Sequence, residues 1–349
     1  MVNTAPCLTR QKRCPRFPLS LLVLKNPLNI VLDSGIVFQS ICRLLLDHTN
    51  FQIYPDKDIA ECSQALPKNK GEIRIAILLQ WIDIDKYKWQ PLELLGDEII
   101  DTLCAVTAIA LSRTDGYARC DSFRINVDDV LALCQKEQSH RAYTLRQRAL
   151  VIAHLQLFKQ IFVSLYRVQD NTNADDRNQL VHSSLLQVMV GKHEGCQVPC
   201  EARLCTSYEI RLGPWINLKP PLASLHTTMQ RQVLKYHSQR ERYPKRLGRY
   251  LSLMFRVNKH KTGGVVVRHT GVLLKQAGIK LDALHPERTK RMFEDALARL
   301  AMDGIIGRYW VDDCTLRELV DQRARGWWHI YVTWLWHIEP PRNAEISFQ

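Results

Sequence analysis

The chain has 349 residues, enough for two domains of ordinary size and hardly for a third. Hydrophobic residues make up 46% of it, a globular composition that excludes a chain disordered throughout. Its 48 Lys and Arg against 35 Asp and Glu give a formal net charge of +13, which favours an anionic partner, and nucleic acid is the usual one.

The excess of positive charge is concentrated in one part of the chain. Residues 231–275 hold twelve Lys and Arg and one acidic residue, a net charge of +11. Residues 51–130 hold nine basic and fourteen acidic residues, and the first 27 residues add a charge of +5. This asymmetry predicts that the second half contacts the polyanion and that the first half has another task.

Residues 1–70 are predicted to be a basic N-terminal extension with two short apolar segments, Leu19–Leu24 and Ile36–Leu46. No apolar run reaches the roughly 18 residues that a membrane span needs. The run at Leu19–Leu24 is also too short for the core of a secretory signal, and no small-residue cleavage site follows it. We therefore expect a cytoplasmic protein that makes no membrane contact.

Residues 71–217 are predicted to form a first domain. A continuous apolar run at 73–81 is typical of a strand. In the segment Asp97–Ser112 apolar residues recur at steps of three and four, which predicts a buried helix. Asn126 can cap a second, short helix.

A third helix and two strands complete this predicted domain. The spacing Thr144-x-x-Gln147 matches a capping box and predicts a helix that ends near Lys159. The segments Ile161–Val168 and Thr206–Leu212 are predicted strands, with an insertion near 169–205 between them. The third helix and the residues before it offer cations in acidic surroundings, so this domain is predicted to touch DNA, to dimerise or to dock partner proteins: Arg141, Arg146, Arg148 and Lys159.

The insertion contains a possible metal site. The chain has eleven cysteines and no Cys-x-x-Cys pair, so most are expected to be reduced, buried thiols. Four soft ligands nevertheless fall within thirteen residues: His193, Cys196, Cys200 and Cys205. They could hold a tetrahedral zinc ion, although every spacing differs from the usual zinc motifs. The alternative is a polar loop with incidental cysteines.

Residues 218–341 are predicted to form a second domain, followed by a tail at 342–349. It begins with a linker at Leu218–Pro221 and an amphipathic helix around Arg246–Lys259, which Gly263 and Gly264 interrupt. A very short strand at Val265–Val267 and a short helix at His269–Ala277 follow, with Gly278 at the left-handed position that ends the helix.

The clearest predicted helix of the chain starts at Pro286 and ends at Asp303-Gly304. Its apolar residues form one stripe: Met292, Phe293, Ala296, Leu297, Leu300 and Ala301. Strands are predicted at Ile305–Val311 and at Trp328–Ile338. Helix, helix, helix, strand, loop, strand therefore occurs twice, which predicts an α+β, helix-rich fold of two tandem winged-helix domains.

A winged-helix domain places its third helix in the DNA major groove, where arginine to guanine is the commonest specific contact. Here Arg291 points away from the apolar stripe, and Arg288 and Lys290 flank it, so these three residues are the candidates for base contact. The alternative is an ordinary salt-bridged surface helix, because acidic residues share this face: Glu287, Glu294 and Asp295.

Contacts to the DNA phosphates are predicted mainly from the basic segment. The candidates there are Arg242, Lys245, Arg246, Arg249, Lys259, Lys261, Arg268 and Lys275. In the predicted wing, Arg323 and Arg325 are weaker candidates, since acidic residues surround them. The tryptophans between 328 and 336 alternate on one strand face, which favours a place in the core over a stacking platform for single-stranded bases.

Three runs of residues resemble the plasmid replication initiators of the tandem winged-helix type: Arg242–Leu251, His285–Leu297 and Leu300–Ile306. The paired-domain layout and a final strand that ends in Ile-Glu-Pro-Pro, at Ile338–Pro341, add to this resemblance, which covers about residues 73–341. It implies a C-terminal winged helix that binds origin repeats. It also implies an N-terminal one that mediates dimerisation, in a monomer–dimer equilibrium, and helps recruit host replication proteins.

Three functions follow in order of preference. The first is a non-enzymatic, sequence-specific double-stranded DNA-binding protein without a cofactor, which initiates replication of a plasmid or another mobile element. The second is a transcriptional regulator or autorepressor built from the same domains. The third is a metal-dependent enzyme acting on nucleic acid, which the sequence disfavours, since it has neither a P-loop nor a His-Glu-x-x-His motif.

Overall fold

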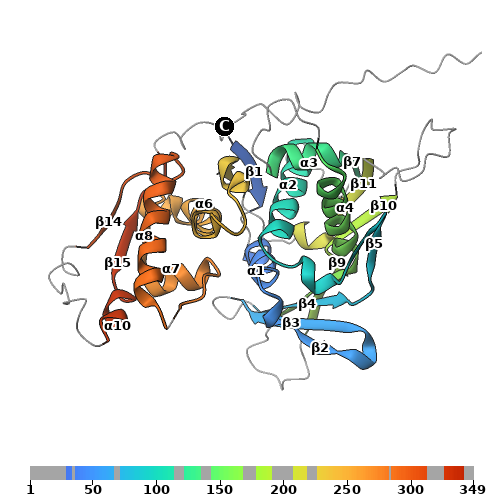
Figure 1. Ribbon diagram of the computed structural model, residues 1–349, viewed down its shortest axis with the longest axis horizontal. Helices are drawn as coiled ribbons and strands as arrows, with labels where there is room; N and C mark the ends of the chain where they lie inside the picture. The colour runs from blue at the N-terminus through green and yellow to red at the C-terminus, as the bar shows by residue number, and fades with distance from the viewer. Residues whose placement is uncertain are drawn as a thin grey trace, which may run out of the picture.

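The protein is described here from a computed structural model (Figure 1). The structure describes residues 29–33, 36–66, 71–113, 122–134, 143–167, 178–190, 207–217, 226–282, 284–312 and 326–341. The first half of the chain lies on one side of the molecule and the second half on the other, and helix α6 (Arg242–Thr262) lies between them in the view of Figure 1.

Each half contains six elements in the same order: helix, strand, helix, helix, strand, strand. In the first half these are α2 (Asp97–Arg113), β7 (Phe123–Asn126), α3 (Val127–Cys134), α4 (Leu145–Gln160), β10 (Leu186–Val190) and β11 (Ser207–Leu212). In the second half they are α6, β13 (Val266–His269), α7 (Thr270–Gln276), α8 (Pro286–Met302), β14 (Tyr309–Val311) and β15 (Leu335–Ile338).

The three strands of each set form one small antiparallel sheet, and the two sheets are connected in the same way. The strand order is β10-β11-β7 in the first half and β13-β15-β14 in the second. In both, the last strand of the set lies in the middle, between the first and the second. The two halves therefore repeat one α+β topology.

The first half carries a further sheet that the second half lacks in the described residues. Its five antiparallel strands are β2 (Gln52–Tyr54), β3 (Ile59–Ala65), β4 (Glu72–Leu78), β8 (Ile161–Arg167) and β9 (Asn178–Ser184), in that order. The other elements of this half are α1 (Ile36–Leu44), the hairpin of β5 (Ile82–Ile84) and β6 (Tyr87–Trp89), and 3₁₀ turns at His48–Asn50, Pro55–Lys57, Pro91–Leu94 and Pro214–Asn217.

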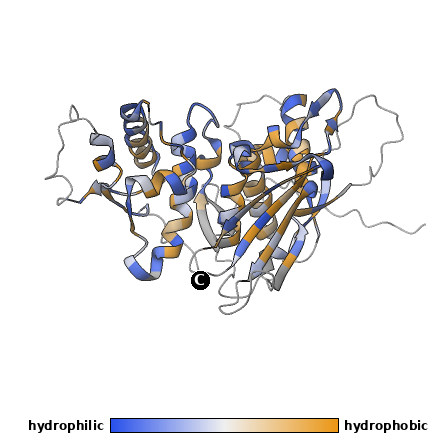
Figure 2. Cartoon of the chain, turned by 90° about the horizontal axis from the view of Figure 1, so that it is seen from below, coloured by the Kyte–Doolittle hydropathy of each residue, from blue (hydrophilic) through white to orange (hydrophobic). Residues whose placement is uncertain are grey.

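One strand pair joins the two halves, and two short helices complete the second half. Strand β1 (Asn29–Asp33) pairs with β12 (His226–Gln230), and the short helices α5 (Gln232–Lys235) and α10 (Trp327–Tyr331) lie before α6 and before β15. Buried hydrophobic residues form a continuous cluster that draws on both halves. Figure 2 shows hydrophobic residues along the strands and helices on both sides of the molecule.

The predicted helix boundaries hold where capping residues mark them. The side chain of Asn126 accepts the backbone N–H of Asp128 (2.9 Å) at the start of α3. Thr144 and Gln147 exchange the two hydrogen bonds of a capping box at the start of α4. Gly263 and Gly278 follow α6 and α7 with left-handed φ values of 62° and 69°, which side chains with a Cβ rarely adopt.

Three strand predictions are wrong in their role or extent. Of the strand expected at Ile305–Val311, the structure has strand geometry only in β14, Tyr309–Val311. The strand at Ile161–Val168 is predicted to pair with the strand at Thr206–Leu212, but β8 lies between β4 and β9 in the large sheet. The strand that pairs with β11 is β10, and both β9 and β10 lie within the segment near 169–205 that is predicted to be an insertion. Of the strand expected at Trp328–Ile338, the structure has a helix, α10, and then β15. The rings of Trp327 and Tyr331, four residues apart, meet at 6.0 Å, a spacing that suits a helix.

Part of the predicted N-terminal extension belongs to the folded structure. From residue 29 on it supplies β1, α1, β2 and β3, and β3 pairs along its whole length with β4. The buried face of β3 consists of the small residues Ala60 and Cys62, so its alternation gives a weak sequence signal. No helix in the described part of the chain is both long enough and apolar enough to cross a bilayer.

Candidate nucleic-acid interface

Helix α8 is fixed to the core of the second half by one face. Thr289, Phe293, Ala296, Leu297 and Leu300 are buried, and Met292 and Ala301 at the edges of the predicted stripe are partly buried. The ring of Phe293 meets that of Trp336 on β15 edge to face, with 5.6 Å between the ring centroids. Helix α8 therefore rests on the small sheet with its opposite face outward.

That outward face carries two free arginines. Arg288 and Arg291 are both exposed, and among the described residues neither side chain has a hydrogen-bond or ion-pair partner. Glu287 and Asp295 are exposed on the same helix, so the face is mixed in charge, as the alternative interpretation expects. The two arginines are nevertheless available to an external ligand without breaking any contact that the structure describes.

Lys290 differs from its two neighbours. Its side chain is 19% exposed, its Nζ donates to Oε2 of Glu294 (2.9 Å), and it lies 5.5 Å from the ring centroid of Tyr331. The Tyr331 hydroxyl also donates to Glu294 (3.3 Å). Contact between Lys290 and a base would break these interactions, so this residue is a weaker candidate than Arg288 and Arg291.

The C-terminal end of α8 is tied through Asp303 to Tyr236, the residue that follows α5. Its carboxylate accepts the hydroxyl of the buried Tyr236 (2.6 Å) and the Nε–H of Arg299 (2.9 Å). Burial and the hydrogen bond to Asp303 raise the pKa of Tyr236, which therefore remains a donor at any physiological pH. This contact holds the C-terminal end of α8, and together with the ring contact of Phe293 it fixes the direction in which the arginines project.

The predicted phosphate-contacting residues separate into two groups. Four are exposed: Arg242, Lys259, Lys261 and Lys275. Arg268 is half-buried, and its Nη1 donates to the carbonyl of Val267 (2.8 Å). The other three, Lys245, Arg246 and Arg249, turn inward.

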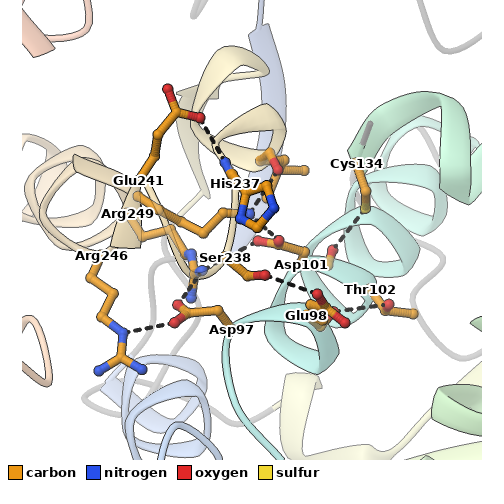
Figure 3. Close-up of polar contacts among 12 residues, drawn as sticks. Asp97, Glu98, Asp101, Thr102, Cys134, His237, Ser238, Glu241, Arg246 and Arg249 are labelled. Atoms are coloured by element: carbon orange, nitrogen blue, oxygen red, sulfur yellow. Dashed lines mark hydrogen bonds and ion pairs between the residues drawn. The ribbon is translucent and has the colours of Figure 1, made fainter. Parts of the chain in front are cut away.

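Lys245, Arg246 and Arg249 form a buried ion cluster with α2 of the first half, which corrects their predicted role. Figure 3 shows Arg246 and Arg249 beside Asp97 and Asp101. Lys245 is 1% exposed; its Nζ donates to Asp101 and to the carbonyl of Leu234 (2.8 Å). Nε of Arg246 and Nη2 of Arg249 bond the two carboxylate oxygens of Asp97, at 2.8 and 2.7 Å.

Charges in this cluster compensate one another in a buried environment. Burial alone would raise the pKa of Asp97, but the charges of Arg249 and Arg246 outweigh burial and hold that pKa below its usual value. Burial raises the pKa of Asp101, against the opposing charges of Lys245 and Arg249. A polyanion cannot reach these three cations, so they contribute to the junction of the halves and not to a DNA surface.

The sequence analysis does not identify Asp97 and Asp101 as partners of the basic segment, because they lie 144 to 152 residues before the cations. The sequence nevertheless contains a signal that these two carboxylates need partners. Asp97 and Asp101 lie four residues apart on a helix that is mostly apolar after its first turn, and a charge on a buried helix requires an ion-pair partner. The basic segment at 231–275 is the richest source of such partners in the sequence.

The third helix of the first half is in a different environment from α8. From Ala149 to Phe158, every residue of α4 is buried except Leu150 and Gln156, which are partly buried. It lies against α3 on one side and against β5 and β10 on others. Arg148 forms a bidentate pair with Asp128 (2.8 and 2.9 Å), whereas Arg146 and Lys159 are exposed at the two ends.

Several predicted residues lie outside the described residues: Arg141, Arg323, Arg325, and the candidate zinc ligands His193, Cys196, Cys200 and Cys205. Within the described residues, no group of three His, Cys, Asp or Glu side chains could hold a metal ion. The tryptophans are divided: Trp336 is in the core, Trp327, Trp328 and Trp334 are partly buried against it, and Trp310 is 43% exposed.

Comparisons with known proteins find little. No known family matches the chain, and no curated protein does. Two solved structures share a TM-score of 0.47 and 0.46 with it, each at 11% identity: selenomethionine domains 2 and 3 of RctB, and RctB domains 2–3. They cover 85% and 87% of this chain, and the chain covers 98% and 96% of theirs. Similarity at this level does not place the chain in a family.

Proposed function

We propose that both halves are winged-helix domains and that the second half binds double-stranded DNA in a sequence-specific way. In a winged helix three helices and a small sheet alternate in the order found here, and the third helix enters the major groove. The observation that carries this proposal is the outward face of α8, where Arg288 and Arg291 are exposed and unpaired among the described residues.

Phosphate contacts are assigned to the cations that remain exposed. Arg242, Lys259, Lys261 and Lys275 lie on α6 and α7, the helices that precede α8 in the same domain. Such contacts set affinity and its dependence on salt, whereas arginines at base edges set sequence preference. With three of the eight candidates withdrawn into the ion cluster, the expected salt dependence is correspondingly weaker than the charge of the basic segment suggests.

The first half is proposed to serve partners or a second copy of the chain. Its third helix, α4, is buried along most of its length, so it cannot enter a major groove unless the surrounding strands move away. This burial supports a division of labour in which DNA reading belongs to the second half. Dimerisation and recruitment of host replication proteins are the tasks that the sequence resemblance implies for the first.

We further propose that the DNA target is a replication origin of a plasmid or another mobile element, with autorepression of a promoter as the alternative. The DNA-binding surface would be the same in both. Footprinting on the DNA that flanks the coding sequence separates them. Tandem direct repeats beside an AT-rich segment support an initiator, and one palindrome over a promoter supports a regulator.

The protein is proposed to act without catalysing a reaction and without a cofactor. A nicking assay on supercoiled DNA with Mg²⁺ or Mn²⁺ tests this, and turnover that depends on the metal would contradict it.

Selection of bound sequences from random duplex DNA tests the central proposal with the full chain. We expect a defined consensus that contains guanine, and we expect Arg291→Ala to flatten the preference at one position of it. Recovery of no consensus, with equal binding to all duplexes, would contradict sequence-specific recognition.

A further inference from the structure

Several exposed apolar side chains lie on α7, on α8 and in the turn between them. In the described part of the chain nine large hydrophobic side chains are exposed, and four of these lie between the start of α7 and the end of α8: Val272, Leu281, Leu284 and Met302. The same segment carries Arg288 and Arg291. The helix pair proposed to meet DNA thus combines cations with apolar groups that the fold leaves uncovered.

Leu284 is the most exposed of them, at 86%. It directly precedes His285, the N-cap residue of α8, and an apolar residue at this position usually packs on the fourth residue of the helix. Here that fourth residue is the buried Thr289, whose hydroxyl accepts the backbone N–H of Asp282 (3.3 Å). The usual apolar contact is absent, and the Leu284 side chain is left in solvent.

The backbone that presents Leu284 is nevertheless fixed. One carboxylate oxygen of Asp282 accepts the N–H groups of both Leu284 and His285, each at 3.1 Å. These two hydrogen bonds, together with the one from the Asp282 backbone N–H to the Thr289 hydroxyl, tie the turn to the buried face of α8. A side chain on a fixed backbone loses less entropy on binding than one on a flexible loop. Leu284 lies four residues before Arg288, at the end of α8 that would enter the groove first.

We propose that Leu284 contacts the 5-methyl group of a thymine in the major groove, beside the base that Arg288 contacts. This rests on the proposed function, in which α8 enters that groove. The thymine methyl is the apolar group that the major groove presents, and apolar side chains recognise it. A protein partner fits this surface less well. Leu284 and Met302 lie at opposite ends of α8, so the exposed apolar side chains do not form one patch of the roughly 800 Å² that each partner buries in a stable protein interface.

The test uses the full chain and the duplex that it selects, with each thymine replaced singly by deoxyuridine. This replacement removes the methyl group and leaves the hydrogen-bonding groups of the base unchanged. At one thymine the wild-type protein should lose affinity about fourfold, the effect of one buried methyl-sized group. Leu284→Ala should bind the thymine and deoxyuridine duplexes alike at that position. Leu145→Ala, at an exposed leucine of α4, should keep the fourfold difference.

Two results would overturn the assignment. One is a Leu284→Ala variant that still distinguishes thymine from deoxyuridine as the wild type does. The other is a wild-type protein that selects a sequence but is indifferent to every thymine methyl. If the wild type selects no sequence at all, the proposed function itself fails and this inference falls with it, so the two failures are distinguishable.

Discussion

At the scale of single residues, Lys245 shows how misleading a basic segment can be. From sequence it is one cation among twelve. In the fold it is 1% exposed and donates to Asp101 on α2 and to the carbonyl of Leu234. A buried charge of this kind specifies which surfaces meet, and removing one partner leaves the other uncompensated.

Lys245→Met should therefore destabilise the protein by about 3 kcal/mol, because it leaves Asp101 buried with fewer partners. Lys259→Met, at an exposed position of the same helix, should stay within about 0.5 kcal/mol of the wild type. Urea unfolding measures both. For DNA binding the order reverses, and Lys259→Met should reduce the salt slope by about one unit whereas Lys245→Met should not. A stable Lys245→Met protein with a reduced salt slope would restore Lys245 as a phosphate contact.

His154 on α4 predicts a pH dependence of stability. Its ring is buried, Nδ1 lies 2.8 Å from the hydroxyl of Thr102 on α2, and burial lowers the pKa of His154 to about 3. In the unfolded chain it titrates near its usual pKa of about 6.5. Between these values the unfolded state binds more protons, so stability falls as pH falls from 6.5 towards 3, by up to about 1.4 kcal/mol per pH unit.

Unfolding free energies of the wild type and of His154→Asn, measured from pH 7 to pH 4.5, check this contribution. The variant keeps a polar side chain near Thr102 but does not titrate. The stability of the variant should fall less steeply with decreasing pH. The two slopes should differ by up to about 1.4 kcal/mol per pH unit, the value for one proton. Parallel curves for the two proteins would show that His154 is protonated in the folded state or does not contribute.

At the scale of elements, α4 and α8 occupy the same place in one repeated topology and have opposite environments. Helix α8 has one buried and one exposed face, whereas α4 is covered by α3, β5 and β10. The sequence contains this difference. The residues Ala149 to Leu155 of α4 are apolar or nearly so on all sides, apart from one histidine, and a helix that is hydrophobic all round is buried.

The contact between α6 and α8 depends on Gly248. A Cβ at this position would lie 3.1 Å from a methyl group of Leu300 on α8 and 3.2 Å from one of Val233. We expect Gly248→Leu to push the helices apart and to destabilise the protein by about 2 kcal/mol, the usual effect of overpacking. Because α8 carries the arginines, specific DNA binding should weaken as well.

Thermal unfolding and binding to the selected duplex measure the two effects of Gly248→Leu. Val257→Leu, at an exposed position of the same helix, is the matched control and should leave both unchanged. Full stability and full binding of Gly248→Leu would mean that α8 does not depend on this close approach.

The sequence predicts features that depend on neighbouring residues, and it does not predict pairings between distant segments. Local signals, such as the capping box at Thr144 and the Pro286 start of α8, depend on neighbouring residues, and the structure confirms them. The position of β8 in the large sheet and the partners of Lys245 depend on residues tens to hundreds of positions away. No periodicity encodes such pairings, although the carboxylates at Asp97 and Asp101 on a buried helix call for partners.

At the scale of the whole molecule, strand pairing, ion pairs and hydrophobic packing join the halves. Strand β1 pairs with β12, the ion cluster joins α2 to α6, and Lys280 pairs with Asp47 (2.6 Å). The buried hydrophobic cluster also extends across both halves. The halves should therefore unfold together.

Calorimetry should show one transition, and a core substitution in either half should shift the whole of it. Ile75→Ala on β4 and Leu297→Ala on α8 remove side chains that are fully buried, and each should cost about 2–5 kcal/mol. Two resolved transitions, with each variant moving one of them, would show that the halves are independent and that the ion cluster does not couple them.

The measurement that tests the account most directly compares one arginine on the third helix of the second half with one on the third helix of the first half. Arg291→Ala and Arg146→Ala, both at exposed positions, are assayed on the full chain for affinity to the selected duplex and to a scrambled one. Loss of a bidentate arginine–guanine contact should reduce the specificity ratio of Arg291→Ala by about 5- to 150-fold. Arg146→Ala should keep the wild-type ratio. An unchanged ratio for Arg291→Ala, or a loss confined to Arg146→Ala, would contradict DNA reading by α8.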